Sequence, residues 1–235
     1  MCTVSFFKTK NAVIFTSNRD EKKDREKAIF PEYLESETQT LYFPRDKKAL
    51  GTWFVTDNAG NTAILLNGAF KNHESNPPYK KSRGTVLLDL MKRESFLIAF
   101  RAYDLSGIEP FQLLVYSEQK LFRLLWDGGK KHEIFLDENK NYLLSSKTLY
   151  NDSIEDDRIR EFNKLLNVEN ISSEQILHFH KEHQIEKEPG IKEMVKEKLM
   201  TVSITQLVIT AQSIELSYYD LVQNTSQKEK IEKRN

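Results

Sequence analysis

The stretch that decides the fold is residues 2–7, CTVSFF, followed by residues 12–17, AVIFTS. Both runs are rich in β-branched and aromatic residues, and a short polar segment, residues 8–11, separates them. This pattern predicts a β-hairpin whose loop is longer than the tightest turns. In an antiparallel hairpin the end of the second strand returns to the start of the first. The sequence therefore predicts that residues 17–20 lie beside residue 2.

Cys2 is the only cysteine in the 235 residues, and it directly follows Met1. Removal of Met1 would leave its thiol beside a free α-amino group. An α-amine titrates near ~7.7–8.0 and a thiol near ~8.5, so at neutral pH the amine can act as base for the thiol. N-terminal threonine enzymes join nucleophile and base in this way. The alternative is a small apolar residue that opens a buried strand, since free cysteine is among the most buried residue types.

The motif Asn18-Arg19-Asp20-Glu21 follows the second strand of the predicted hairpin. Close to Cys2, an arginine can hold a thiolate or bind a substrate carboxylate. An acid there can fix the α-ammonium group or orient the free amine. The alternative is a solvated turn that opens a charge run, because residues 22–27 are all charged.

Further patterns predict strands at residues 52–56, 62–66, 111–116, 121–126, 132–136, 142–145, 200–210 and 214–221, and helices at residues 82–92, 96–103, 152–166 and 172–183. Ser82 is a candidate N-cap for the first helix. In helix 152–166 we expect one apolar side, formed by Ile154, Ile159, Phe162 and Leu166. Residues 18–50 are mostly polar, and no strand is predicted there beyond the hairpin.

This order of elements is an α+β pattern and not the strict alternation of a parallel doubly wound sheet. We expect two antiparallel sheets stacked between helical layers. A single domain is predicted for residues 1–221, and a flexible charged tail for residues 222–235.

Composition limits the classes of function. The chain has 35 basic and 35 acidic residues and no dense Lys/Arg stripe, which argues against general nucleic-acid binding. One cysteine excludes an intramolecular disulfide and fits a reducing compartment. The first twenty residues lack the unbroken apolar run of a signal peptide, and no window approaches the ~18 apolar residues of a membrane span. We therefore expect a cytoplasmic protein with no membrane span.

His178, His180 and His183 lie in the last predicted helix. Positions 178 and 180 point about 200° apart on a helix, and no H-E-x-x-H motif is present. We expect an exposed polar face there and no metal site.

Four runs resemble the NRDE family, also named transport and Golgi organisation protein 2: MCTVSFF at the start, SNRDE at residues 17–21, GTWF at residues 51–54 and LNG at residues 66–68. The resemblance extends to about Gly84 and recurs weakly at residues 144–146 and 200–205. It implies an N-terminal-nucleophile hydrolase fold, a four-layer αββα sandwich. It also implies kinship with choloylglycine hydrolases and acyltransferases that cleave linear amides.

The resemblance also assigns roles to residues. Cys2 would attack the carbonyl, while Arg19 and Asp20 would sit beside its thiol and amine. Asn67 would be an oxyanion donor, a task that suits a side-chain amide.

Departures from the family pattern concern substrate binding. The related hydrolases space their arginine and aspartate further apart than the adjacent pair here, so Asn18 and Glu21 are alternatives for one of those roles. Ser146 stands where many relatives have an asparagine, and Val202 where an arginine often precedes the final strand pairing. The substrate-binding candidates are therefore Asn18, Glu21 and Ser146.

Two functions stay open. One is an amide hydrolase or acyltransferase that acts on a small linear amide through Cys2, with no cofactor and no metal. The other is a non-catalytic member of the fold that binds an apolar ligand or a partner, because members of the family have been linked to secretory-pathway organisation and haem handling. A haem needs an axial ligand such as His, Cys or Met, and the sequence does not select one of its five histidines. The sequence does not give the oligomeric state.

Overall fold

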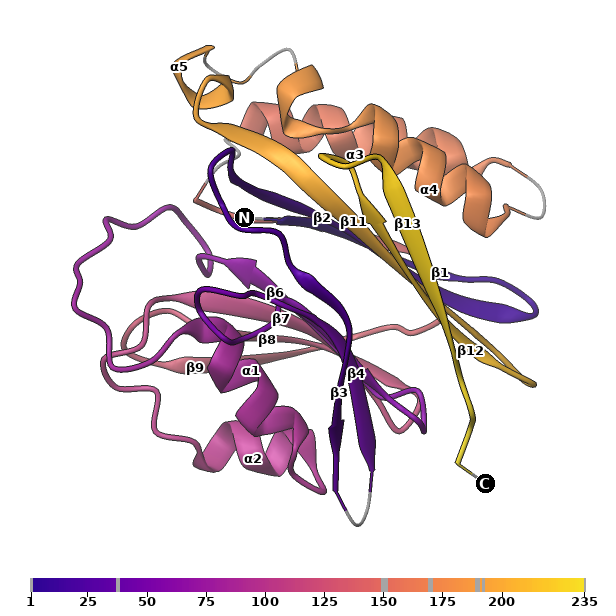
Figure 1. Ribbon diagram of the computed structural model, residues 1–235, viewed down its shortest axis with the longest axis horizontal. Helices are drawn as coiled ribbons and strands as arrows, with labels where there is room; N and C mark the ends of the chain where they lie inside the picture. Colours follow the sequence, from indigo (N-terminus) through magenta and orange to yellow (C-terminus); the bar gives the residue numbers. More distant parts are fainter. Residues whose placement is uncertain are drawn as a thin grey trace. The chain divides into compact units, whose positions relative to one another are not determined.

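The computed structural model describes residues 2–36, 39–148, 152–168, 171–188, 191 and 193–234, and for residues 2, 152, 153, 193 and 194 it describes the backbone alone. Backbone contacts divide the chain into two compact units: residues 1–25 with 139–231, and residues 26–138 with 232–235. Within the described ranges each unit holds one antiparallel sheet (Figure 1). The two antiparallel sheets and the α+β class are therefore confirmed. The boundary at residue 221 stays a prediction.

The first unit joins the two ends of the chain in one sheet with strand order β10-β1-β2-β11-β12-β13. Its strands are β1 (Cys2–Lys8), β2 (Ala12–Lys22), β10 (Tyr142–Ser145), β11 (Leu199–Thr210), β12 (Ile214–Asp220) and β13 (Thr225–Ile231). Its helices are α3 (Asp152–Leu166), α4 (Ser173–Glu182), the short 3₁₀ helix η1 (Ile185–Lys187) and α5 (Glu193–Lys196). The predicted hairpin, the long helix and the last strand pair are all confirmed.

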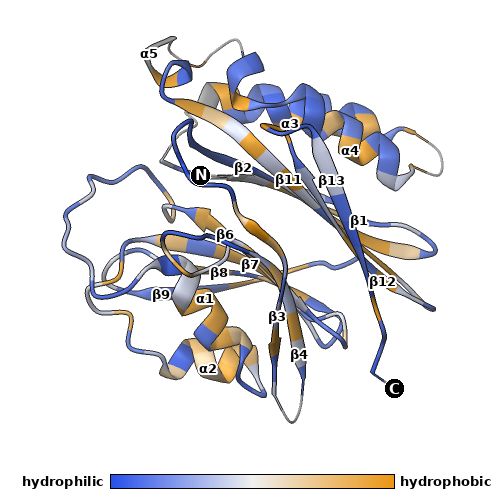
Figure 2. Cartoon of the chain, viewed as in Figure 1, coloured by the Kyte–Doolittle hydropathy of each residue, from blue (hydrophilic) through white to orange (hydrophobic). Residues whose placement is uncertain are grey.

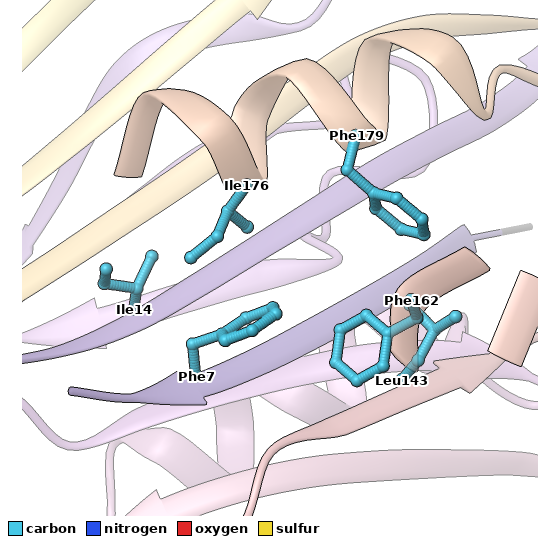
Figure 3. Packing of buried hydrophobic residues seen from close by; sticks show 6 residues of the cluster. All are labelled: Phe7, Ile14, Leu143, Phe162, Ile176 and Phe179. Atoms are coloured by element: carbon cyan, nitrogen blue, oxygen red, sulfur yellow. The ribbon is translucent and has the colours of Figure 1, made fainter. Parts of the chain in front are cut away.

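A hydrophobic cluster joins α3 and α4 to one face of this sheet (Figure 3). Its buried members are Phe7, Ile14, Leu143, Phe162, Ile176 and Phe179. The rings of Phe7 and Phe162 lie 4.9 Å apart between centroids. In Figure 2 much of the surface of α3 and α4 is hydrophilic, as expected for helices that bury one side only.

The buried side of α3 differs from the predicted one. Ile154 and Phe162 are buried, but Ile159 and Leu166 are 36% and 41% exposed. The residue between the two buried apolar ones, at the i+4 position, is Arg158, which is 1% exposed. The prediction places all the apolar residues of this helix on one side. Residues 154, 158 and 162, each four positions apart, form the more regular helical face.

The second unit has strand order β3-β4-β5-β6-β7-β8-β9. Its strands are β3 (Ile29–Glu35), β4 (Thr40–Arg45), β5 (Phe54–Asp57), β6 (Thr62–Asn67), β7 (Phe111–Ser117), β8 (Lys120–Trp126) and β9 (Lys131–Leu136). Its helices are α1 (Arg83–Met91) and α2 (Phe96–Ala102). Ser82 caps α1 as predicted, because its side chain accepts a hydrogen bond from the Thr85 backbone N–H.

Two glycines of this unit allow a close backbone crossing. A Cβ atom built on Gly51 would lie 2.4 Å from the backbone carbon of Gly84, and the Thr52 N–H donates to the Gly84 carbonyl at 3.2 Å. No side chain fits in that space. The glycine of the G-T-W-F run therefore allows the start of α1 to dock closely against this segment.

Three strands were not predicted. β3 and β4 lie in the polar stretch of residues 18–50, and β13 lies in the segment predicted as a flexible tail. β13 pairs with β12 over its whole length, and Lys228 forms an ion pair with Glu215 of that strand at 2.7 Å. The tail prediction is therefore wrong for residues 225–231. An edge strand can be polar, because it needs backbone pairing on one side only.

The cluster around Phe162 gives a stability prediction. Phe162→Ala should lower the free energy of unfolding by about 3–5 kcal/mol, because it removes a ring from a packed core. Leu166→Ala, on the same helix but 41% exposed, should change it by less than about 1 kcal/mol. Urea unfolding followed by circular dichroism measures both values. Equal losses in the two variants would contradict the packing described here.

Candidate active site

The register of the hairpin places position 2 in a transverse row of the first sheet. Cys2 pairs with Arg19, Arg19 with Ser203, and Ser203 with Asp220. On the other side of β1, Thr3 pairs with Ser145, the last residue of β10. Ser146 is the residue that directly follows β10. The Cys2 side chain lies outside the described part of the structure, so its place in the row is given by its backbone.

Arg19 is buried, with 5% of its surface exposed, on the sheet face opposite the helices. Its positive charge acts on Tyr218, two residues before Asp220 on β12. Burial raises the pKa of the Tyr218 hydroxyl, while hydrogen bonding and the Arg19 charge oppose that rise. A buried cation thus lies directly across the ladder from position 2, and the role predicted for Arg19 stays a prediction.

The four-residue motif is divided between the two faces of β2, because side chains alternate along a strand. Asp20 lies on the same face as Asn18, toward the helical elements. The Thr201 hydroxyl donates to Asp20 Oδ1 at 2.6 Å and accepts from the Ile185 N–H at 3.0 Å. Asp20 is fully buried. Thr201, which the sequence did not single out, therefore fixes one oxygen of this carboxylate. The predicted role of Asp20 toward the Cys2 amine stays a prediction.

Asn18 lies on the helical face of β2. It is fully buried, and its Nδ2 donates to the backbone carbonyls of His180 and His183 at 3.0 and 3.2 Å. Its Oδ1 lies 2.7 Å from His180 Nδ1. All three polar contacts are to the region of α4. These contacts hold α4 against the sheet, and the predicted role of Asn18 in substrate binding stays a prediction.

His180 corrects a second expectation. It was predicted on an exposed polar face, but it is 1% exposed. Its Nε2 lies 2.8 Å from Ser5 Oγ. Burial, together with the nearby charges of Arg158 and His183, lowers the pKa of His180 to about 3. The ring is therefore neutral at physiological pH.

Arg158 places a second buried cation on the helical side. Its Nε donates to Glu188 Oε1 at 2.6 Å, its Nη1 to the Thr3 hydroxyl, and its Nη2 to the His183 carbonyl at 2.8 Å. The charge pair is closed off from solvent, with side-chain exposures of 1% for Arg158 and 6% for Glu188. Hydrogen bonding and nearby positive charge outweigh burial, so the pKa of Glu188 is lowered.

The remaining predicted residues are spread over the chain. Ser146 is fully buried, and its Oγ lies 3.1 Å from Thr148 Oγ1. Glu21 is half-buried, and its Oε1 accepts from the N–H of Lys22 at 2.9 Å. Asn67 ends β6 in the second unit. The roles predicted for these residues stay predictions.

Within the described residues, no group of three His, Cys, Asp or Glu side chains is arranged to hold a metal ion. Among the same residues, no helix combines the length and the apolar character needed to span a membrane.

The family assignment comes from the sequence as a whole. The model of the family described as Transport and Golgi organisation 2 matches residues 1–228. The chain belongs to the Transport and Golgi organisation 2 family. No curated protein matches the sequence significantly.

Solved structures show which fold this family member has. A C2A mutant of conjugated bile acid hydrolase from Clostridium perfringens aligns with a TM-score of 0.58 at 11% identity, over 100% of this chain and 97% of that one. The Caenorhabditis elegans ortholog of N-acylethanolamine-hydrolyzing acid amidase aligns with a TM-score of 0.60 at 11% identity, over 88% and 92%. Both have the sandwich fold of N-terminal-nucleophile hydrolases. At such identities the likeness shows the fold alone.

The buried imidazole gives a pH prediction. His180 has a pKa of about 3 in the folded chain, against about 6.5 when unfolded. Between these values only the unfolded chain binds the proton, so stability falls as pH falls below 6.5. The slope from this one group is up to about 1.4 kcal/mol per pH unit.

Urea unfolding at several pH values between 4 and 7 measures that slope. His180→Asn should be less stable at neutral pH, but its stability should fall less steeply than that of the wild type. His178→Asn, at an exposed position of the same helix, should keep the wild-type slope. An unchanged slope in His180→Asn would contradict a neutral buried ring.

Proposed function

We propose that this protein is an N-terminal-nucleophile amidase or acyltransferase in which Cys2, freed by removal of Met1, cleaves a small linear amide. The observation that carries the proposal is the ladder register that sets position 2 opposite the buried Arg19. Directly opposed residues of an antiparallel pair share a face, with Cβ atoms about 4.5–5.5 Å apart. The fold shared with amide-cleaving N-terminal-nucleophile hydrolases supports the same assignment.

The proposed chemistry needs only the terminal residue and a polarising environment. The Cys2 thiolate attacks the carbonyl carbon of the amide, after its proton has passed to the α-amine. The C–N bond then breaks, the α-ammonium returns the proton to the leaving amine, and the acyl group stays on sulfur as a thioester. Water cleaves the thioester to the carboxylic acid, or a second amine accepts the acyl group. Both outcomes regenerate Cys2.

Arg19 has two roles available in this scheme. A guanidinium close to a thiol favours the thiolate and lowers the thiol pKa. The same group can bind a carboxylate on the substrate. Burial of Arg19 strengthens either effect, because electrostatic interactions are stronger where the effective dielectric constant is low than they are in water.

Ser146 and Val202 bear on the substrate class. Val202 lies at a bulge in the pairing of β11 with β2, between Thr201 and Ser203, and its carbonyl accepts from the N–H of Leu221. An apolar side chain at this point supplies no charge for an acidic substrate. Removing a single oxyanion donor costs roughly 10²–10³ in turnover, so a serine in place of an amide predicts slow cleavage. We therefore propose small or apolar amides as substrates.

The second candidate is a non-catalytic member of the fold that binds a ligand or a partner. The observation in its favour is the engagement of Ser146 Oγ with Thr148 Oγ1 at 3.1 Å, at a position where the related hydrolases often have an amide. Haem ligation by His180 does not fit this structure, since both of its ring nitrogens have partners.

Removal of Met1 is the first prediction of the proposed function. The mechanism needs a free amine on Cys2, so protein purified from cells should begin at residue 2. Intact mass spectrometry measures this directly. Retention of Met1 in most molecules would leave an ordinary thiol and favour the binding function.

Turnover is the second prediction. The wild type should hydrolyse small acyl amides slowly, and Cys2→Ala should abolish this activity. Ser146→Asn and Val202→Arg restore the residue types of the related hydrolases and should raise activity, the second mainly toward acidic conjugates.

Release of the amine from a panel of acyl amides measures these rates. Activity that survives in Cys2→Ala would come from another site or a contaminant. No activity in any variant would favour the non-catalytic function.

A further inference from the structure

A connected group of buried polar side chains lies behind the start of β1, on the helical face of the sheet. We call it the polar clamp: Thr3, Ser5, Asn18, Arg158 and His180. Each member is at most 2% exposed. The group joins four elements: β1, β2, α3 and α4. All of these residues belong to the first unit.

The hydrogen bonds of the clamp have fixed directions. Asn18 Nδ2 faces two carbonyls, so its Oδ1 must be the atom that faces His180 Nδ1. That nitrogen therefore carries the proton, and Nε2 accepts from the Ser5 hydroxyl at 2.8 Å. On the other arm, Arg158 Nη1 donates to the Thr3 hydroxyl. Both arms end on β1, at the first and third residues after Cys2.

Ser5, His180 and Asn18 have the connectivity of a nucleophile, a base and an orienting group. Ser5 is nevertheless fully buried beneath α4, and so is Asn18. A substrate carbonyl cannot approach a hydroxyl that is enclosed in this way. The three residues therefore do not form a second catalytic site, and their geometry serves to hold β1.

The first residues of a chain are poorly ordered unless something ties them down. Backbone pairing of β1 with β2 and β10 supplies part of that restraint. On the helical face, apolar packing does not supply the remaining restraint at this end of β1. Thr3 and Ser5 are polar, and Phe7 is the first apolar residue of β1 on that face. The polar clamp takes the place of such packing.

We propose that the polar clamp is a positioning device for the nucleophile: Arg158 and His180 hold the hydroxyls of Thr3 and Ser5 so that Cys2 stays opposite Arg19. The inference rests on the proposed function of Cys2. Arg158 and His180 are positioning residues, since their hydrogen bonds reach Thr3 and Ser5 of β1 and they act through that strand.

Alkylation of the full-length protein by iodoacetamide tests this directly, because Cys2 is the only cysteine. The rate constant is measured from pH 5 to pH 10 in wild type, Thr3→Val, Ser5→Ala and Thr3→Ser. Thr3→Val keeps the β-branched shape and removes only the hydroxyl that Arg158 reaches. Ser5→Ala tests the His180 arm.

The matched control is Thr16→Val. Thr16 is also buried on the helical face of the hairpin, but its hydroxyl accepts from Gln206 Nε2 at 3.0 Å, outside the clamp. Both threonine-to-valine variants should lower the thermal midpoint by a few degrees, roughly the effect of one lost hydrogen bond. A merely structural role for Thr3 would make the two variants alike in every readout.

Thr3→Val and Ser5→Ala should move the apparent thiol pKa toward the value of about 8.5 of a model thiol. At pH 7 alkylation should slow about threefold or more, the effect of a rise in pKa of about half a unit. Thr3→Ser should restore the wild-type profile, and Thr16→Val should keep it. A wild-type profile in Thr3→Val, or an equal shift in Thr16→Val, overturns the clamp proposal. If the apparent pKa of the thiol in the wild type equals that of a model thiol, the proposed function itself is overturned.

Discussion

The position of β2 between β1 and β11 is the constraint on which the candidate site depends. Side chains alternate between the two faces of a strand, so a shift of the register by one residue would exchange the faces. Arg19 would then point into the helical side, and Asn18 would take its place in the row of Cys2. The observed register sets Cys2 opposite Arg19 and Thr3 opposite Asn18. One pairing thus determines both the electrostatics of the row and the partners of the clamp.

The helical face of this sheet is part apolar and part polar. Around Phe7 and Phe162 it packs as an ordinary core. Closer to Cys2, the interior instead contains a neutral imidazole and a buried ion pair. Replacing such groups by apolar residues often costs nothing or adds stability, whereas removing one partner of a pair is strongly destabilising. Hydrogen bonds are directional, so the polar end fixes the position of a strand more closely than apolar contacts do.

Much of the fold could be predicted from periodicity and turn chemistry. The hairpin, Ser82 as N-cap and the bounds of α3 followed from local signals that tertiary structure did not override. β3 and β13 were missed because edge strands can be polar, and β4 was missed because its apolar run, residues 41–43, is short and lies in a polar stretch. Arg158 and His180 were missed for a related reason. Hydrophobic patterns assign polar and charged residues to the surface. Only the spacing of such a residue relative to its apolar neighbours indicates that it lies inside.

The site was predicted less completely than the fold. The pairing of Arg19 with Cys2 follows from hairpin geometry alone, whereas no local pattern indicates that Thr201 lies beside Asp20. The opposite orientation of Asn18 and Arg19 could have been deduced, because adjacent residues of a strand face opposite sides. The division into two compact units depends on contacts between residues that are distant in sequence, which no local pattern reports.

The sheet that contains Cys2 is built from both ends of the chain, with residues 26–138 inserted between them. On a ribosome, β1 and β2 emerge long before β11, their neighbour in the sheet. At about 5–20 residues per second, the delay between Lys22 and Leu199 amounts to roughly 9 to 35 seconds. During that interval the sheet around the hairpin is incomplete, although α3 and α4 precede β11 in the chain. The hairpin that carries Cys2 therefore gains its neighbour on the β11 side only after most of the chain has been made.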